Sequence, residues 1–225
     1  MLPSETLIRQ NDTHRLIPSR YSDGGASVLT RIADSERHLD DIVSLDTLTN
    51  DRILGEHDLL PGIGVHELVF DVPYYHVINA AFTHAQPQGS RFNGPNRGAW
   101  YAAFDVETSQ QEVIYHKTVD LSEIKYFHDD VTYDDYVADF TASFHDIRGD
   151  GRFADCLDSD SYVASQKLAE DLLGAKALGV TYHSVRHNGG VCIACFRPAL
   201  VGNVRKDLTY RFVWSGDPVP TVTTM

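Results

Sequence analysis

One short stretch of the chain combines side chains that bind anions and stack on flat ligands. The segment Gly89–Phe104 holds Arg91 and Arg97 in a loop of Gly, Pro and Asn, and Tyr101 follows in an apolar run. Such a loop leaves backbone N–H groups free, and the planar fork of Arg suits phosphate. The residues leave two interpretations open: an anion-binding loop, or two arginines that merely neutralise nearby carboxylates.

Tyr101 and Glu112 each have a structural and a chemical interpretation. The ring of Tyr101 either packs in the core or offers a flat surface to a ligand. Glu112 lies three residues after Ser109, which is the spacing of a helix capping box. A glutamate that is ionised at neutral pH also stabilises positive charge that develops in a transition state. The residues alone leave both interpretations open.

Other chemical motifs fail on their spacing. The chain has no P-loop and no Rossmann glycine pattern, which argues against a P-loop nucleotidase and an ordinary dehydrogenase. Cys192 and Cys195 form C-x-x-C, but in a predicted strand they face opposite sides, so we expect them to be buried rather than to bind zinc. Asp146–Leu157 fails as a calcium loop, with Arg148 and Leu157 at ligand positions. The eleven histidines lack metal-ligand spacing, so no metal is expected.

The first part of the chain is expected to be helical and the rest to contain short strands. Residues 1–60 are predicted to be a largely helical N-terminal section packed on the core, because Ala26–Ile42 has apolar residues near helical spacing. Pro61-Gly62-Ile63-Gly64 marks the boundary with a domain over 61–225. Beyond it, strands or strand-adjacent segments are predicted at His66–Asp71, Tyr74–Ala80, Trp100–Phe104, Lys125–His128 and Thr209–Trp214.

Two helices and a hairpin complete the expected elements. A short helix over Thr108–Lys117 carries Glu112, and a longer one over Ser161–Leu178 is capped by Asp160 or Ser161 and ended by Gly179. Asn-Gly-Gly between two apolar runs predicts a hairpin of Val180–Arg186 and Val191–Phe196. Helices, then strands, a helix and a hairpin together predict an α+β fold rather than alternating βαβ units.

Charge and composition exclude several partners. The 225 residues carry a net charge of −13, which argues against binding to nucleic acid or to an anionic membrane. The stretch Asp129–Asp160 holds ten aspartates and is expected to be an exposed acidic loop region, or else a docking surface for a basic partner. Three cysteines and an N-terminus without an apolar core favour an unexported protein of a reducing cytoplasm.

The order of the chemical residues resembles the RES domain family, which includes the toxins of RES–Xre toxin–antitoxin pairs. The resemblance covers roughly Gly89–Val201, about half of the chain. It rests on Arg91 in a Gly/Pro loop, Tyr101 ten residues on and Glu112 eleven further. His183-Ser184-Val185-Arg186 and Val191–Pro198 then follow far downstream. The chain departs from many family members in having Asn96-Arg97 where their loop is uncharged.

The resemblance implies an ADP-ribosyltransferase-like split β-sheet core flanked by helices. It also implies that NAD+ is a substrate rather than a cofactor, and that the nicotinamide–ribose bond is cleaved by hydrolysis or phosphorolysis. Carried over to this chain, Arg91, Tyr101 and Glu112 are the catalytic residues. Ser184 binds the substrate, hydrogen-bonding the nicotinamide amide or a ribose hydroxyl, and Arg97 is a candidate second phosphate contact.

Two other functions remain compatible with the same residues. One is mono-ADP-ribosylation of a protein target, and the other is a non-catalytic NAD+-binding or interaction module. By family analogy the partner is a helix-turn-helix antitoxin of the Xre type. The final acceptor, the way an antitoxin binds, homo-oligomer formation and the role of residues 1–60 are left open by the sequence.

Overall fold

One mixed β-sheet organises the residues that the computed structural model describes, which are 2–22 and 62–225. Its strands are β1 (Glu5–Pro18), β2 (Trp100–Ala103), β3 (His128–Asp146), β4 (Gly179–His183), β5 (Val191–Cys195), β6 (Gly202–Ser215) and β7 (Thr221–Thr224). Their order is β1-β2-β5-β4-β3-β6-β7. Neighbouring strands are antiparallel except for β3 and β4, which are parallel.

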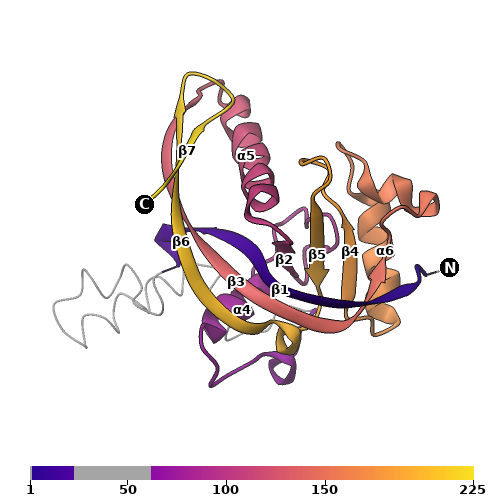
Figure 1. Cartoon of the computed structure of the whole chain (residues 1–225). Coiled ribbons are helices and arrows are strands. Elements are labelled where there is room, and N and C mark those ends of the chain that lie inside the picture. The colour runs from indigo at the N-terminus through magenta and orange to yellow at the C-terminus, as the bar shows by residue number, and fades with distance from the viewer. Residues whose placement is uncertain (1, 23–61) are drawn as a thin grey trace.

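The sheet curls because β1 has two partners. Most of β1 pairs with β3, from Glu5 opposite His145 to Pro18 opposite Tyr133, and His14 also pairs with Ala103 of β2. Strands β3 and β6 are long and strongly curved, whereas β2, β5 and β4 are short and lie side by side (Figure 1). The curl brings β1 beside the short strands that carry the chemical residues.

Three α-helices pack on this sheet within the described residues. They are α4 (Tyr75–Thr83), α5 (Val106–Glu123) and α6 (Val163–Gly174), and short 3-10 turns lie at Ser19–Tyr21, Val65–Glu67, Gly151–Leu157 and Pro198–Leu200. Helix α5 lies inside the curve of β3 and β6, and α6 lies beside β4 (Figure 1). None of the helices in these ranges combines the length and apolar character needed to cross a membrane.

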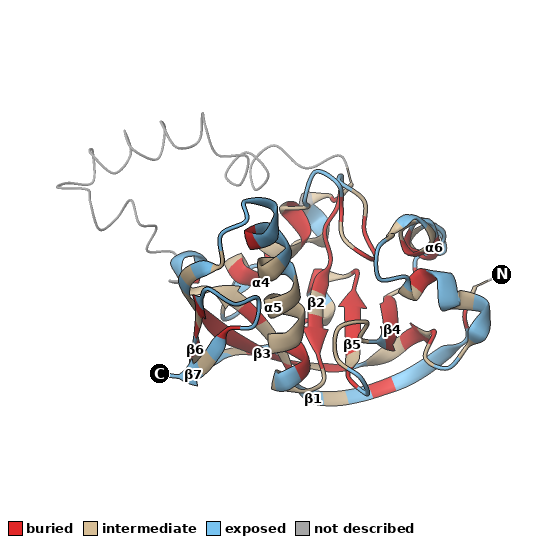
Figure 2. Ribbon diagram, turned by 90° about the horizontal axis from the view of Figure 1, so that it is seen from above, coloured by how far each residue is buried: buried red, intermediate tan, exposed pale blue. Residues whose placement is uncertain are grey.

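The side chains of β5 point alternately into two parts of the core, one on each face of the strand. Cys192 packs in a cluster with Leu168 and Leu172 of α6, whereas Cys195 packs in a cluster with Phe82 of α4 and Trp100. Strands β2, β5 and β4 are therefore buried on both faces (Figure 2). The expectation that the two cysteines are buried and face opposite sides is confirmed.

The α+β class is confirmed, together with several of its predicted elements. The strands at Trp100–Phe104 and Thr209–Trp214, the hairpin of β4 and β5, and the helix over Ser161–Leu178 are present, with α6 shorter than expected. Tyr162 is the N-cap of α6 and makes no side-chain capping bond, but the Ser161 hydroxyl oxygen accepts from the Val163 N–H at 3.4 Å, so Ser161 supplies a weak cap from one position earlier. Gly179 begins β4 rather than ending the helix.

The helical expectation for the N-terminal section is wrong for residues 5–18. This segment is β1, and its strand pairing with β3 joins residues more than 110 positions apart. Since β1 is part of the central sheet, this portion does not merely pack on the core. The expected helix over Ala26–Ile42 lies outside the described residues, as does the start of the boundary segment at Pro61.

The strands expected before the arginine loop are also wrong. The 3-10 turn Val65–Glu67 overlaps the start of the expected strand His66–Asp71, and Tyr74–Ala80 is largely helix α4. Helix α4 buries Ile78 and Phe82 on one face. Tyr74 has a left-handed backbone, with φ of 58°, and turns the chain into the helix after Pro73. Tertiary burial thus overrides the local β-like composition.

The acidic region is a buried strand over much of its length. The expectation of an exposed loop over Asp129–Asp160 fails for the part that forms β3, His128–Asp146, but holds for most of residues 151–160, which are exposed outside any strand or α-helix. The predicted strand Lys125–His128 overlaps β3 at His128 alone. Asp134 and Asp135 are 1% and 0% exposed. Lys206 pairs with Asp134, and His14 pairs with Asp135. These carboxylates neutralise internal cations and are not available to a basic partner.

Replacement of Gly179 by Ala is expected to destabilise the fold by about 2 kcal/mol, because this residue has φ of 153° and a Cβ would collide with the Ala194 carbonyl and the Phe144 ring. Gly174→Ala is the matched control, since a Cβ there meets nothing and Ala favours helix, so it should be neutral or stabilise by up to about 1 kcal/mol. Urea unfolding of both variants checks this. Equal stability of the two variants would contradict it.

Candidate active site

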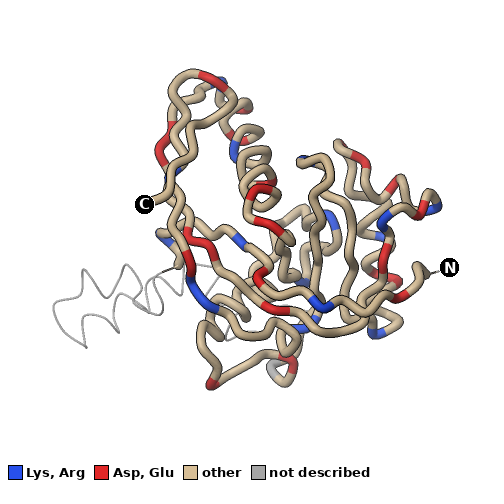
Figure 3. The backbone as a smooth tube through the Cα atoms, in the orientation of Figure 1, with Lys and Arg blue, Asp and Glu red and all other residues tan. Residues whose placement is uncertain are grey.

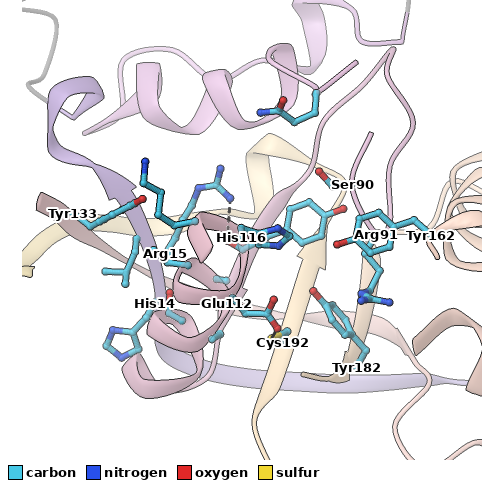
Figure 4. Close-up of a pocket in the computed structure, with 18 of the residues that line it drawn as sticks. His14, Arg15, Ser90, Arg91, Glu112, His116, Tyr133, Tyr162, Tyr182 and Cys192 are labelled. Atoms are coloured by element: carbon cyan, nitrogen blue, oxygen red, sulfur yellow. Dashed lines mark hydrogen bonds between the residues drawn. The ribbon is translucent and has the colours of Figure 1, made fainter. Parts of the chain in front are cut away.

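A cavity of about 570 Å³ brings together three residues that the sequence singled out. Arg91 from the loop before β2, Tyr101 from β2 and Glu112 from α5 all line it. Residues of β1 and Tyr162 complete its wall. Figure 4 shows Arg91 and Tyr162 on one side of Glu112 and Arg15 on the other. Residues that are far apart along the chain therefore meet in one pocket.

The loop that carries Arg91 has a rigid form. Gly89 has φ of 73°, and Ser90 and Asn93 exchange backbone hydrogen bonds of 2.9 and 3.3 Å. Arg91 is 8% exposed and donates to the carbonyls of Cys156 and Asp158, at 3.1 and 2.8 Å. Its guanidinium also lies 4.8 Å from the centroid of the Tyr162 ring. The described residues give this cation no carboxylate partner, so it stays available to an anion.

Tyr101 packs in the core and also lines the cavity. Its hydroxyl accepts from the Phe92 backbone N–H and donates to Asn93 Oδ1, both at 2.8 Å, so it fixes the loop that carries Arg91. One face of the side chain packs in the core, and another lines the cavity. Burial raises the pKa of Tyr101 well above its ordinary value, so its phenol stays uncharged.

Arg97 does not reach the cavity. It makes a two-pronged ion pair with Glu67, at 2.9 Å for each bond, and also donates to the carbonyls of Gly62 and Phe196. Arg197 binds the same carboxylate of Glu67 at 2.9 Å. The structure therefore separates the two arginines of the loop. Arg97 neutralises a carboxylate and braces the loop from behind, and the phosphate contact expected for it is not supported.

Glu112 lies in the second turn of α5, facing the cavity. The helix begins four residues earlier than the capping box required, because Asp105 is its N-cap and accepts from the Thr108 N–H at 2.7 Å. The capping box of Ser109 and Glu112 is therefore not formed, and the Glu112 side chain does not cap the helix. Its Oε1 instead accepts a hydrogen bond of 2.7 Å from the Ser184 hydroxyl.

Ser184 is oriented by the turn that follows β4. Its oxygen accepts from the backbone N–H groups of Arg186 and His187, at 3.1 and 3.0 Å, and its proton is donated to Glu112. The sequence-based hypothesis gave Ser184 a contact with substrate, whereas here it contacts the carboxylate. His187 Nδ1 lies 2.8 Å from the Thr108 hydroxyl, so the same turn is attached to the start of α5.

The sequence reasoning missed several cavity residues, four of which bear on the chemistry of the site. They are Arg15, His116, Tyr162 and Tyr182. Arg15 was missed because residues 1–60 were expected to be helical. Tyr162 lies one position beyond the expected cap of α6, and His116 lies one turn after Glu112 on the same helix. That last spacing is the one signal that could have been used, since residues four apart share a helix face.

Burial keeps three other titratable groups of the cavity neutral, Tyr182, Cys192 and His116. It raises the pKa of Tyr182 and the pKa of Cys192, whose Sγ lies 4.0 Å from Glu112 Oε1, so this cysteine is a thiol rather than a nucleophilic thiolate. Burial also lowers the pKa of His116, which is therefore uncharged at neutral pH. The charged groups that face the cavity are Glu112 and Asp120 opposite Arg15, Arg91 and Lys117.

The described residues hold no cluster of three His, Cys, Asp or Glu side chains that could bind a metal ion. The cavity instead combines one fixed carboxylate, arginines without carboxylate partners and several aromatic rings. These groups suit an organic ligand that carries both flat rings and negative charge.

The RES domain model matches residues 67–215 of this chain. Because the match covers more than half of the 225 residues, the chain belongs to the RES domain family. The mixed sheet flanked by helices agrees with the fold that the resemblance implied.

Comparison with solved structures finds similar chains. One of them is a chain of the Mycobacterium tuberculosis MbcT–MbcA toxin–antitoxin complex, at 16% identity and a TM-score of 0.43, covering 55% of this chain and 71% of that one. No curated protein matches the chain.

Loss of the Glu67 charge should lower the stability of the fold. Hydrogen bonds from Arg97, the Gly64 backbone and Arg197, together with the charge of Arg97, lower the pKa of Glu67 from 4.5 to about 2. The folded state therefore gains stability above pH 4.5, and this gain is lost as the pH falls towards 2. We expect Glu67→Gln to cost about 2 kcal/mol at pH 7 and much less at pH 3.

Urea unfolding of the wild type and Glu67→Gln across this pH range measures the difference. Glu170→Gln is the control, because Glu170 is exposed and pairs only with Lys167 on the helix surface. A difference for Glu67→Gln that does not change with pH would show that the ion pairs do not cause it.

Proposed function

We propose that the protein cleaves the nicotinamide–ribose bond of NAD+ and acts as the toxin of a toxin–antitoxin pair. The observation that carries the proposal is the meeting of Arg91, Tyr101 and Glu112 in one cavity. Membership of the RES domain family supports the same reaction. The cavity volume of about 570 Å³ falls in the usual range for sites that take small ligands and cofactors.

Glu112 is proposed to stabilise the charge that develops on the ribose. When the bond to nicotinamide breaks, the ring nitrogen takes the bonding electron pair and the ribose becomes oxocarbenium-like, as in glycosidases. A fixed carboxylate beside that carbon lowers the energy of the transition state. The hydrogen bond from Ser184 holds the Glu112 carboxylate in one orientation before substrate arrives.

The other residues are proposed to bind and orient the dinucleotide. Arg91 holds the diphosphate or a polar oxygen near it, because its remaining N–H groups have no protein acceptor among the described residues. Tyr101 offers its ring to nicotinamide. Tyr182, which also lines the cavity with an uncharged phenol, adds a second aromatic wall.

Water or inorganic phosphate is the proposed acceptor. Attack of water on the ribose carbon gives ADP-ribose, nicotinamide and a proton, and attack of phosphate gives ADP-ribose-1-phosphate and nicotinamide. As a toxin the protein is proposed to be held inactive by a helix-turn-helix antitoxin, which family membership supports. Depletion of NAD+ would then stop growth when the antitoxin is lost.

Glu112→Gln should reduce NAD+ cleavage by about 10²–10³-fold, the usual scale for one electrostatic stabiliser. The isosteric amide keeps the shape of the side chain and removes its charge. Purified protein is incubated with NAD+, with and without phosphate, and the products are identified by mass spectrometry. Glu123→Gln, an exposed position at the end of the same helix, is the control and should retain full activity.

The products also separate the alternatives. Free ADP-ribose or ADP-ribose-1-phosphate supports the proposal, and ADP-ribose attached to a protein supports the transferase. Binding of NAD+ without turnover supports a non-catalytic module. In cells, induction of the wild type should lower NAD+ and arrest growth, whereas Glu112→Gln should do neither. Wild-type turnover by Glu112→Gln would remove this residue from the mechanism.

Ser184→Ala should lower kcat for NAD+ about 10-fold and leave KM nearly unchanged. A hydrogen bond to a charged acceptor contributes about 1.5–3 kcal/mol, and part of it is replaced by water. Steady-state kinetics separates the two parameters. An effect confined to KM would instead favour the direct contact of Ser184 with substrate.

A further inference from the structure

Most cations of the described chain are neutralised by carboxylates. Arg148 pairs with Asp146, Arg152 with Asp150, Arg211 with Asp130 and Arg205 with both Asp12 and Asp139. Lysines and arginines lie interspersed with acidic residues along the strands and helices (Figure 3). This pattern is expected for a protein with a net charge of −13, and fewer than half of the described lysines and arginines have no carboxylate partner among the described residues.

Arg15 is such a cation, and it lines the cavity from β1. One terminal N–H donates to the Tyr101 carbonyl at 3.0 Å, and the guanidinium carbon lies 5.0 Å from the centroid of the Trp100 ring. Its Nε is buried and has no hydrogen-bond acceptor. Neither contact supplies negative charge, and burial lowers the pKa of Arg15 to about 10.

An arginine in this position is costly unless an anion joins it. Removing a charge from water without a counter-charge is unfavourable, and a guanidinium has five N–H donors to satisfy. Lys117 offers a contrast, because it lines the same cavity but already pairs with Asp129 at 2.6 Å. We therefore expect a ligand in the cavity to accept hydrogen bonds from Arg15 and to supply its counter-charge.

Arg15 and Arg91 reach the cavity from different elements of the fold. Arg91 comes from the loop before β2, and Arg15 comes from β1 on the other side of Glu112 (Figure 4). A ligand that meets both extends across the carboxylate. A dinucleotide carries a diphosphate between its two ribosides and so offers groups to both arginines, whereas a single riboside has no phosphate.

We propose that Arg15 is the diphosphate-binding residue of this cavity, so that the site selects dinucleotides over ribosides without a phosphate. The part of this inference that concerns turnover rests on the proposed function, whereas the part that concerns diphosphate binding does not. Arg91 then serves the polar oxygens of the nicotinamide half. The diphosphate accepts the N–H groups of Arg15 that the protein leaves without an acceptor, and it supplies the missing counter-charge.

The first test measures binding without turnover. Isothermal titration with ADP and with adenosine compares the wild type, Arg15→Gln and Arg9→Gln. Arg9 is exposed on the same strand, outside the cavity, so Arg9→Gln is the matched control. Arg15→Gln should weaken ADP binding about 10–100-fold and change adenosine binding less than 3-fold, as loss of a charge-assisted contact predicts. Failure of the wild type to bind ADP, or equal losses for both ligands, would overturn the proposal.

The second test uses turnover. Arg15→Gln should raise KM for NAD+ about 10–100-fold with kcat within about 3-fold of the wild type, and should leave cleavage of nicotinamide riboside unchanged. A residue that only braces β2 would instead lower both reactions and the melting temperature together. If Arg15→Gln does not fold, Arg15→Lys replaces it, and this variant should weaken ADP binding about 3–10-fold because it keeps the charge but loses the fork.

The two hypotheses fail in different ways. If ADP binds through Arg15 but no dinucleotide is cleaved, the proposed reaction is wrong and the diphosphate site stands. If NAD+ is cleaved by Arg15→Gln with the wild-type KM, the reaction stands and the diphosphate site is wrong.

Discussion

Ser184 donates a hydrogen bond of 2.7 Å to Glu112 across a separation of 72 residues. This contact joins the turn after β4 to the second turn of α5, and the neighbouring contact of His187 with Thr108 joins the same turn to the start of that helix. Glu112 can therefore face the cavity in one orientation only while the hairpin and the helix stay together. The chemistry proposed for the site depends on this attachment, because a carboxylate stabilises charge only where it is held.

The partners of each arginine decide what that arginine can do. Arg97 and Arg197 both pair with Glu67, which neutralises their charge. These contacts hold the loop before β2 against Gly62 and Glu67. Arg91 contacts carbonyls and an aromatic ring, and so does Arg15. These contacts fix a guanidinium in place without cancelling its charge. In an acidic protein this is a way to keep positive charge available inside one cavity.

The strand β1 shows why part of the site could not be predicted. Its residues have no local feature that marks a strand, and its hydrogen bonds come from β3, more than 110 positions away. The segment at Tyr74–Ala80 shows the opposite case, since a β-like composition forms helix α4 once Ile78 and Phe82 can be buried. The acidic strand β3 was predicted to be a loop because its buried carboxylates have no partner nearby in the sequence. Asp134 and Asp135 pair with Lys206 and His14 only in the folded chain.

The sequence by itself determined the α+β class, the hairpin of β4 and β5, the helix that carries Glu112 and the resemblance to the RES domain family. These features depend on turn chemistry, helical spacing and residue type, which act over a few positions. Tertiary structure alone decided that Arg97 faces Glu67, that Ser184 contacts Glu112, that Asp105 rather than Ser109 starts the helix, and that Arg15 enters the cavity. Each of these depends on which distant segment supplies the partner, and no local pattern encodes that choice.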